Sequence, residues 1–258
     1  MDYLKINKKA WDAKTKAHVK SSFYDVPAFV AGKNTLNDIE IKALGDVSGK
    51  RLLHLQCHFG LDTMSWAKLG ADVTGVDLSS VAIDEAKVLS QECNIPAKFV
   101  CDDVMNYMQQ VREFDVVFTS YGAICWLPDI KAWAHGIARQ LKHGGTFFMA
   151  EFHPVYDLIA GYPYFHQAEP DVEEEAVYTE NKSEEKQTIA VWSHPLGGVL
   201  NALLEAGLTI QNFEEFDYSP YDCFDGMEER VKGRYYVKHN GHDVPLVYAL
   251  KATKKQSE

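Results

Sequence analysis

Long apolar runs are absent from the sequence, and so is any paired-cysteine motif. No stretch approaches the roughly 20 apolar residues that a transmembrane helix needs. The N-terminal segment, MDYLKINKKAWDAKTKAHVK, is polar and lacks the apolar core of a secretory signal peptide. The five cysteines include no CxxC pair, so we expect reduced thiols in a cytoplasmic protein.

Positive charge is also scarce. Lys and Arg number 26 against 37 Asp and Glu, which gives a net charge of -11. Binding to nucleic acid or to an anionic membrane needs clustered cations, so we expect neither as a partner. The 258 residues are 46% hydrophobic, enough for one large domain with a packed core. No internal repeat or linker divides them, so residues 1–258 are expected to form a single domain.

From residue 50 onward, short apolar runs alternate with amphipathic segments. This alternation predicts an α/β fold made of βαβ units around a parallel sheet. The expected strands cover 51–56, 71–79, 97–103, 114–121, 146–152, 208–216 and 245–253. The expected helices between them cover 61–70, 79–94, 131–145 and 194–207.

Two segments fall outside this alternation, and both carry aromatic residues. In residues 1–34 we expect a helix over 2–20 followed by a loop, and a short helix then covers 35–47. Residues 153–191 are rich in Tyr, Pro and acidic residues, with a hairpin of AVYT and QTIAVW around ENKSEEK. Because the carboxyl edge of a parallel sheet is open to water unless something lies across it, we expect 1–34 and 153–191 to form a cap and an insertion over the active site.

Acidic residues end two neighbouring strands of the predicted sheet. Asp77 ends the second strand, about 20 residues after the first strand, and could accept hydrogen bonds from both hydroxyls of a ribose. Asp102 and Asp103 end the third, where a carboxylate could accept from an adenine amino group. Ligands bind at this edge of a parallel sheet, so the pattern indicates an adenosine site.

At this point the sequence resembles the class I S-adenosylmethionine-dependent methyltransferases, over about residues 35–152. Five sequence motifs occur in the same order as in the family: LLHLQCHFG, VTGVDLS, FVCDDV, FDVVFTSYGAICWLPD and LKHGGTFFMAEF. The resemblance implies a Rossmann-like sheet of seven strands, order 3-2-1-4-5-7-6, with strand 7 antiparallel and helices on both faces. It also implies S-adenosylmethionine as the cofactor, S-adenosylhomocysteine as its product, and a methyltransferase activity.

The resemblance assigns roles residue by residue. The backbone of Leu55, Gln56 and Cys57 would face the methionine end of the cofactor, and the Ser120 carbonyl would receive its ammonium. Asp77 would hold the ribose, Leu78 and Val104 would sandwich the adenine, and Asp102 or Asp103 would meet its polar edge. Simpler structural roles are open to each: Asp77 as a helix cap, Leu78 and Val104 as core, and one aspartate as a turn residue.

The first loop departs from the family pattern. His54 stands where the family has an acidic residue, and Gln56 and His58 stand where it has glycine, so that only Gly60 remains. Side chains therefore enter a turn that normally needs close backbone approach. His54, Cys57 and His58 also resemble a metal cluster, but their strand-and-turn spacing spreads them apart, and we expect no metal.

The expected acceptor is a small molecule. Ser120-Tyr121-Gly122-Ala123 replaces the Asn-Pro-Pro-Tyr motif of enzymes that methylate DNA adenine or glutamine. Candidate pocket residues are Tyr24, Tyr121, Trp126, Tyr156 and Trp192. His153 and His194 are candidate catalytic bases because imidazole titrates near neutrality, and either could instead be a cap or a hydrogen-bonding residue.

Two other readings stay open. A nicotinamide-dependent oxidoreductase also uses an acidic residue after its second strand, but it requires GxGxxG, which this chain lacks. A non-catalytic binding protein of the same fold would tolerate the missing glycines. The sequence is compatible with a monomer or a homodimer.

Overall fold

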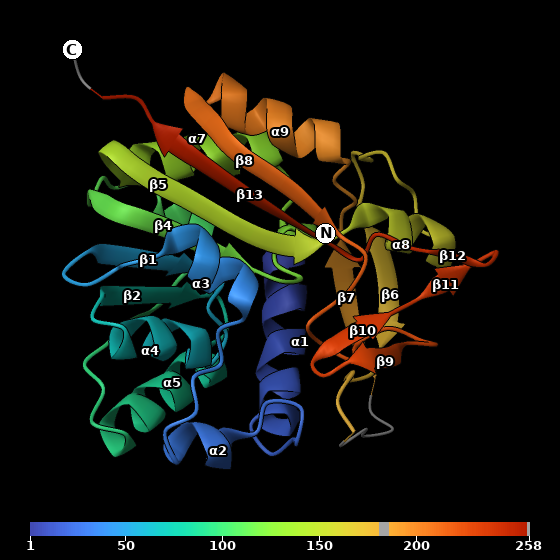
Figure 1. Ribbon diagram of the computed structural model, residues 1–258, viewed down its shortest axis with the longest axis horizontal. Coiled ribbons are helices and arrows are strands. Elements are labelled where there is room, and N and C mark those ends of the chain that lie inside the picture. The colour runs from blue at the N-terminus through green and yellow to red at the C-terminus, as the bar shows by residue number, and fades with distance from the viewer. Residues whose placement is uncertain (181–185, 257–258) are drawn as a thin grey trace.

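The computed structural model, which describes residues 1–180 and 186–256, is built around a seven-stranded sheet of order β3-β2-β1-β4-β5-β13-β8 (Figure 1). Only β13 runs antiparallel to its neighbours, β5 and β8. The predicted fold and strand order are thereby confirmed. The strands are β1 (Arg51–Leu55), β2 (Asp72–Asp77), β3 (Lys98–Cys101), β4 (Phe114–Ser120), β5 (Leu141–Phe152), β8 (Leu208–Phe216) and β13 (Val247–Lys254).

Helices cover both faces of this sheet, as expected for strands with buried residues on both sides. One face carries α3 (Asp38–Leu44), α4 (Leu61–Lys68) and α5 (Ser80–Glu92), and the buried rings of Trp66 and Phe29 pack there. The opposite face carries α6 (Val104–Tyr107), α7 (Ile130–Gln140) and α9 (Leu196–Glu205), around Trp133 and Phe147. The resulting core leaves the carboxyl ends of the parallel strands facing the remaining segments.

Three local predictions were wrong. The helix expected over 131–145 ends at Gln140, because Leu141 already pairs with Phe114 of β4 and begins strand β5. The hairpin uses β6 (Asp171–Glu175) with β7 (Gln187–Val191), so AVYT at 176–179 is not its first strand. The expected loop at 21–34 contains the short helix α2 (Val26–Val30), whose N-terminus is capped by Asp25.

Between β8 and β13 the chain forms two small antiparallel pairs, and a short helix, α8 (Pro154–Ala160), lies near them after β5 (Figure 1). The pairs are β9 (Glu228–Val231) with β10 (Arg234–Tyr236), and β11 (Lys238–His239) with β12 (His242–Asp243).

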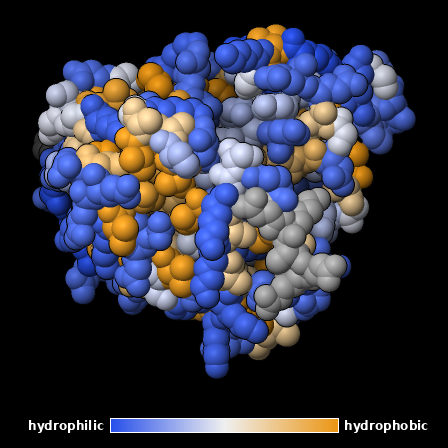
Figure 2. Space-filling model, turned by 90° about the horizontal axis from the view of Figure 1, so that it is seen from below, coloured by the Kyte–Doolittle hydropathy of each residue, from blue (hydrophilic) through white to orange (hydrophobic). Residues whose placement is uncertain are grey.

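The N-terminal helix α1 (Tyr3–His18) lies between the carboxyl edge of the sheet and the β6–β7 hairpin (Figure 1). Asn7 fixes it to β7 by two hydrogen bonds with the backbone of Ala190, at 2.8 and 2.9 Å. Seen from below, the surface carries mostly hydrophilic side chains with apolar ones among them (Figure 2). Within the described residues, no helix is long and apolar enough to cross a membrane.

Candidate functional site

The loop between β1 and α4 has a backbone that only some residues adopt easily. Gln56 and His58 have φ of 57° and 51°, and Gly60 has φ of 77°. For a non-glycine residue this left-handed region costs roughly 1–2 kcal/mol. The loop is held by two hydrogen bonds, from the His58 N–H to Asp77 Oδ2 at 2.8 Å and from Gln56 Nε2 to the Ala123 carbonyl at 2.6 Å.

Asp77 sits at the end of β2 against this loop. Its second oxygen, Oδ1, accepts from the Ser79 N–H at 2.8 Å, so the carboxylate joins the loop to the start of α5. Burial raises the pKa of Asp77 to about 6, although the backbone N–H donors of Ser79 and His58 oppose that effect. The residue is therefore a half-buried hydrogen-bond acceptor at the expected ribose position.

The predicted adenine-side residues divide into two groups. Asp103 is the N-cap of α6, accepting from the Met105 N–H at 3.2 Å, and Val104 is buried in the core. Asp102 follows β3, bonds the Asn106 side chain and is half-buried, as is Leu78. The Asp102 N–H donates to the Asp77 carbonyl at 3.0 Å, which places the two strand ends side by side.

Position 54, where the family has an acidic residue, carries a histidine, and a carboxyl group from helix α4 lies close to that strand end instead. His54 turns its Nε2 to the Ser120 hydroxyl at 3.3 Å and its Nδ1 to Thr63 at 2.8 Å. Asp62, in the first turn of α4, accepts from the Thr35 hydroxyl at 2.6 Å and also from Ser120. Burial raises the pKa of Asp62 to about 6. A carboxyl group thus lies beside Ser120 although position 54 carries an imidazole.

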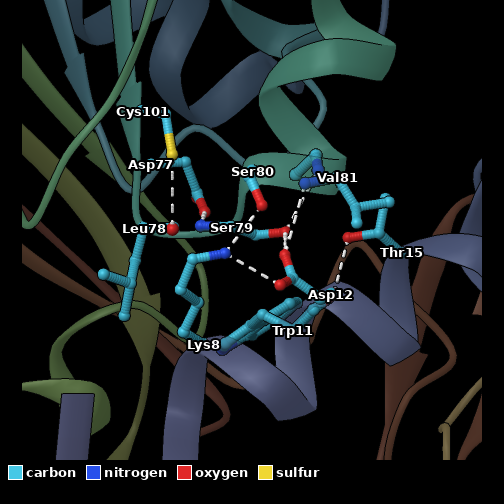
Figure 3. A network of polar contacts seen from close by, with 11 residues as sticks. Lys8, Trp11, Asp12, Thr15, Asp77, Leu78, Ser79, Ser80, Val81 and Cys101 are labelled. Atoms are coloured by element: carbon cyan, nitrogen blue, oxygen red, sulfur yellow. Dashed lines mark hydrogen bonds and ion pairs between the residues drawn. The ribbon is translucent and has the colours of Figure 1, made fainter. Parts of the chain in front are cut away.

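Helix α1 is anchored to the start of α5 by two side chains (Figure 3). Asp12 accepts from the Ser79 hydroxyl at 2.7 Å and from the Val81 N–H at 3.2 Å. Lys8 Nζ lies 2.8 Å from Asp12 Oδ2 and donates to the Ser80 hydroxyl at 2.7 Å. We call these two residues the α1 anchor, since they tie the N-terminal helix to the strand end that carries Asp77.

Aromatic rings gather beneath α1. We define the aromatic cluster as Trp11, His18, Tyr24, His58, Phe59, Trp126 and Tyr178. Trp11 is the centre, with ring centroids 5.2 Å from Trp126 and 5.1 Å from His58. Tyr24 lies 4.9 Å from Phe59 and shares a hydrogen bond with the Tyr178 hydroxyl. The Trp11, Tyr24 and Trp126 side chains are only half-buried, so they keep surface for a ligand.

The predicted acceptor residues do not all meet. Tyr24 and Trp126 belong to the aromatic cluster, and Tyr121 is a neighbouring residue that donates to Glu40 Oε2 at 3.1 Å. Tyr156 stacks on Phe224 at 4.0 Å in a separate small core near α8. Trp192 is buried and packs on Tyr3, at the far end of α1. The structure therefore does not bring these last two to the aromatic cluster.

The two candidate bases have structural partners. His153 is the N-cap of α8, where Nδ1 accepts from the Val155 N–H, and its Nε2 lies 2.8 Å from Glu215 Oε1. His194 Nε2 lies 2.8 Å from the Leu127 carbonyl, and burial lowers its pKa to about 4. These contacts favour the capping and hydrogen-bonding alternatives over catalysis.

Sequence reasoning missed the polar residues that α1 contributes. Lys14 is buried, pairs with Glu175 and lies 5.4 Å from the ring centroids of both Trp11 and Trp126. His18 meets His58 at 3.0 Å. The signal that could have found them is spacing, because residues 11, 14 and 18 share one face of a helix.

Residues 52–145 match the family model for a methyltransferase domain. A ubiquinone biosynthesis O-methyltransferase from Proteus mirabilis is 32% identical over 116 residues, covering 45% of this chain and 46% of the relative. The chain spans about half the length of the curated relatives it matches.

Solved structures agree over more of the chain. An S-adenosylmethionine-dependent methyltransferase from Clostridium acetobutylicum is 15% identical with a TM-score of 0.60, covering 96% of this chain and 98% of the other. Magnesium protoporphyrin IX methyltransferase from Synechocystis PCC 6803 is 15% identical with a TM-score of 0.54, covering 98% and 100%. These likenesses show a shared fold.

The strand order of the sheet is that of the Rossmann-like methyltransferase fold. The match of residues 52–145 to the methyltransferase-domain model agrees with the predicted resemblance to methyltransferases.

Proposed function

We propose that this protein is an S-adenosylmethionine-dependent methyltransferase that acts on a small-molecule acceptor. The observation that carries the proposal is the pair of acidic strand ends, Asp77 and Asp102, side by side at the carboxyl edge and next to the loop at 56–60. The family match over 52–145 and the O-methyltransferase relatives support it.

The residues at this edge fit such a cofactor. Asp77 and Asp102 offer carboxylate oxygens for ribose hydroxyls and an adenine amino group. At the other end, Gln56 Oε1 is a buried acceptor that has no hydrogen-bond partner, and Asp62 lies beside Ser120. A ligand ammonium would supply the donor that Gln56 Oε1 lacks, which removes the cost of about 1–3 kcal/mol for an unpaired buried acceptor.

Bound S-adenosylmethionine would supply a methyl group that is already activated for transfer, so the protein has to position an acceptor and exclude water. The α1 anchor closes the adenosine side of the edge, and the aromatic cluster offers half-buried rings to a planar acceptor. The cap formed by residues 1–34 and the insertion at 153–191 are part of this proposal, since Lys14 and Glu175 join them.

Thermal unfolding tests cofactor binding directly. A ligand that binds only the folded state adds about 2.7 kcal/mol at a hundredfold excess over Kd. S-Adenosylhomocysteine should therefore raise the melting temperature, whereas NAD should not. A shift with NAD alone would support the oxidoreductase alternative, and a shift with neither would refute the proposal.

A non-catalytic binding protein is the second candidate, because side chains at 56 and 58 occupy glycine positions of the family. Transfer of labelled methyl groups to a panel of phenols, amines and thiols separates the two. We further propose a cytoplasmic location, supported by five cysteines that are all unpaired.

A further inference from the structure

Two histidines from distant parts of the chain meet inside the aromatic cluster. His18 Nδ1, from the last turn of α1, lies 3.0 Å from His58 Nε2, in the loop after β1. The rings are nearly perpendicular, with centroids 5.2 Å apart. His18 is fully buried, and Trp11 and Tyr24 contact both imidazoles. This contact joins the N-terminal helix to the loop that the proposed function places at the cofactor.

The outer nitrogen of each ring has no partner within residues 1–180 and 186–256. There, His18 Nε2 and His58 Nδ1 are both buried and both without a hydrogen bond. A neutral imidazole has one N–H and one lone pair, so a pair joined by one hydrogen bond leaves a free donor at one end and a free acceptor at the other. A buried donor that stays unpaired lowers the stability of the fold by about 1–3 kcal/mol. A role in stabilising the fold is therefore a poor explanation for the pair.

We propose that His58 and His18 form a proton-accepting pair for a phenolic acceptor, with His58 as the catalytic residue and His18 as its positioning residue. This inference rests on the proposed function. His58 is the half-buried member of the pair, and its buried Nδ1 would gain its missing partner from the O–H of an acceptor that entered between the rings of the aromatic cluster. The rings of Trp11, Tyr24 and Trp126 suit a planar aromatic acceptor by edge-to-face contact.

The chemistry balances without another reactant. The phenolic O–H gives its proton to His58 Nδ1, and a lone pair of that oxygen forms the new C–O bond as the C–S bond of the sulfonium breaks. The sulfur keeps the electron pair and becomes a neutral thioether. His58 can pass its Nε2 proton to His18 Nδ1, so the pair holds the proton until the products leave.

Burial keeps both rings neutral before a ligand arrives. Burial lowers the pKa of His18 to about 3 and that of His58 well below its usual range, and Lys14 acts in the same direction. The other titratable groups facing the pair are Tyr24, Tyr178 and Asp77. A phenolate formed beside His58 supplies the missing opposite charge, which favours the imidazolium at the moment of transfer.

The probe is 4-nitrocatechol, a phenol whose visible spectrum changes when it ionises. It is titrated into the full chain with saturating S-adenosylhomocysteine, at a pH below the first pKa of the probe. The bound probe should show the phenolate spectrum. In His58→Asn, whose asparagine tolerates the left-handed backbone, at least tenfold less of the bound probe should be ionised. His135→Asn, at an exposed position of α7, is the matched control and should behave as the wild type.

His18→Gln provides a second test, because an amide can keep one hydrogen bond to His58 but cannot take up a proton. It should leave the melting shift with S-adenosylhomocysteine unchanged and reduce ionisation of the probe. Any of three results would refute the proton-accepting role of the pair. These are a neutral bound probe in the wild type, equal ionisation of the probe in His58→Asn, and failure of the probe to bind. Loss of the S-adenosylhomocysteine shift in the wild type would instead refute the proposed function.

Discussion

The α1 anchor makes a strong prediction about stability. Asp12 accepts hydrogen bonds from Ser79 and Val81 at the first turn of α5, and it also pairs with Lys8. Asp12→Ala removes a side-chain acceptor at a helix start, which costs about 0.5–2 kcal/mol. It also removes a negative charge from that helix terminus, which costs about 0.3–1 kcal/mol. We expect a total loss of about 1–3 kcal/mol, or about 2–12 °C in Tm.

Urea unfolding followed by circular dichroism measures this loss. The matched control is Asp84→Ala, because Asp84 also pairs with a lysine on its own helix, Lys87, but is 78% exposed. An exposed pair of this kind contributes about 0–1 kcal/mol, so the control should lie close to the wild type. Equal effects of the two substitutions would refute the anchoring role of Asp12.

The effect should also depend on pH. Burial acts to raise the pKa of Asp12, but the hydrogen bonds from Lys8, Ser79 and Val81 together outweigh it, so the pKa is lowered. A lowered pKa in the folded state gives stability that is present above the unfolded value, near 4, and is lost as pH falls through the folded value. The difference between wild type and Asp12→Ala should therefore shrink below about pH 4.

Three further predictions concern the site. Asp77→Asn should remove most of the melting shift caused by S-adenosylhomocysteine, whereas Asp72→Asn, at the other end of β2, should keep it. Gly60→Ala should lose about 1–3 kcal/mol in urea unfolding because its new Cβ would lie 2.5 Å from an aromatic ring, while Gly207→Ala meets no atom within 4 Å and should lose less. His18→Gln should weaken the dependence of the unfolding free energy on pH below pH 6.5. The buried neutral imidazole of the wild type contributes its full stability above that pH and less as the pH falls toward 3. Equal dependence on pH in the two proteins would contradict this prediction.

The sheet could be predicted because its information is local. Buried parallel strands are short apolar runs, and the helices between them have one apolar face. The spacing of apolar residues along the sequence therefore indicates which residues are buried. The acidic ends of β2 and β3 follow from the same assignment, since parallel strands bring their carboxyl ends to one edge. The helix at 131–145 was extended too far because propensity does not show that Leu141 pairs with Phe114.

The rest of the site depends on contacts between distant segments. His18 and His58 are 40 residues apart, and neither position is distinctive alone. The β6–β7 register is tied to α1 through Glu175 and Lys14, and through Ala190 and Asn7, so the hairpin could not be located from its own residues. The roles of these residues depend on which residues become their neighbours in the folded chain, and residue type alone does not reveal those neighbours.

Hydrogen–deuterium exchange with and without saturating S-adenosylhomocysteine tests the central claim, that the carboxyl edge holds this cofactor. Exchange should slow in the loop at 56–60, in residues 77–81 and in α1, because those amides lie at the proposed site or in the helix anchored beside it. Unchanged exchange in these three segments, or protection confined to the β8–β13 connection, would contradict the account.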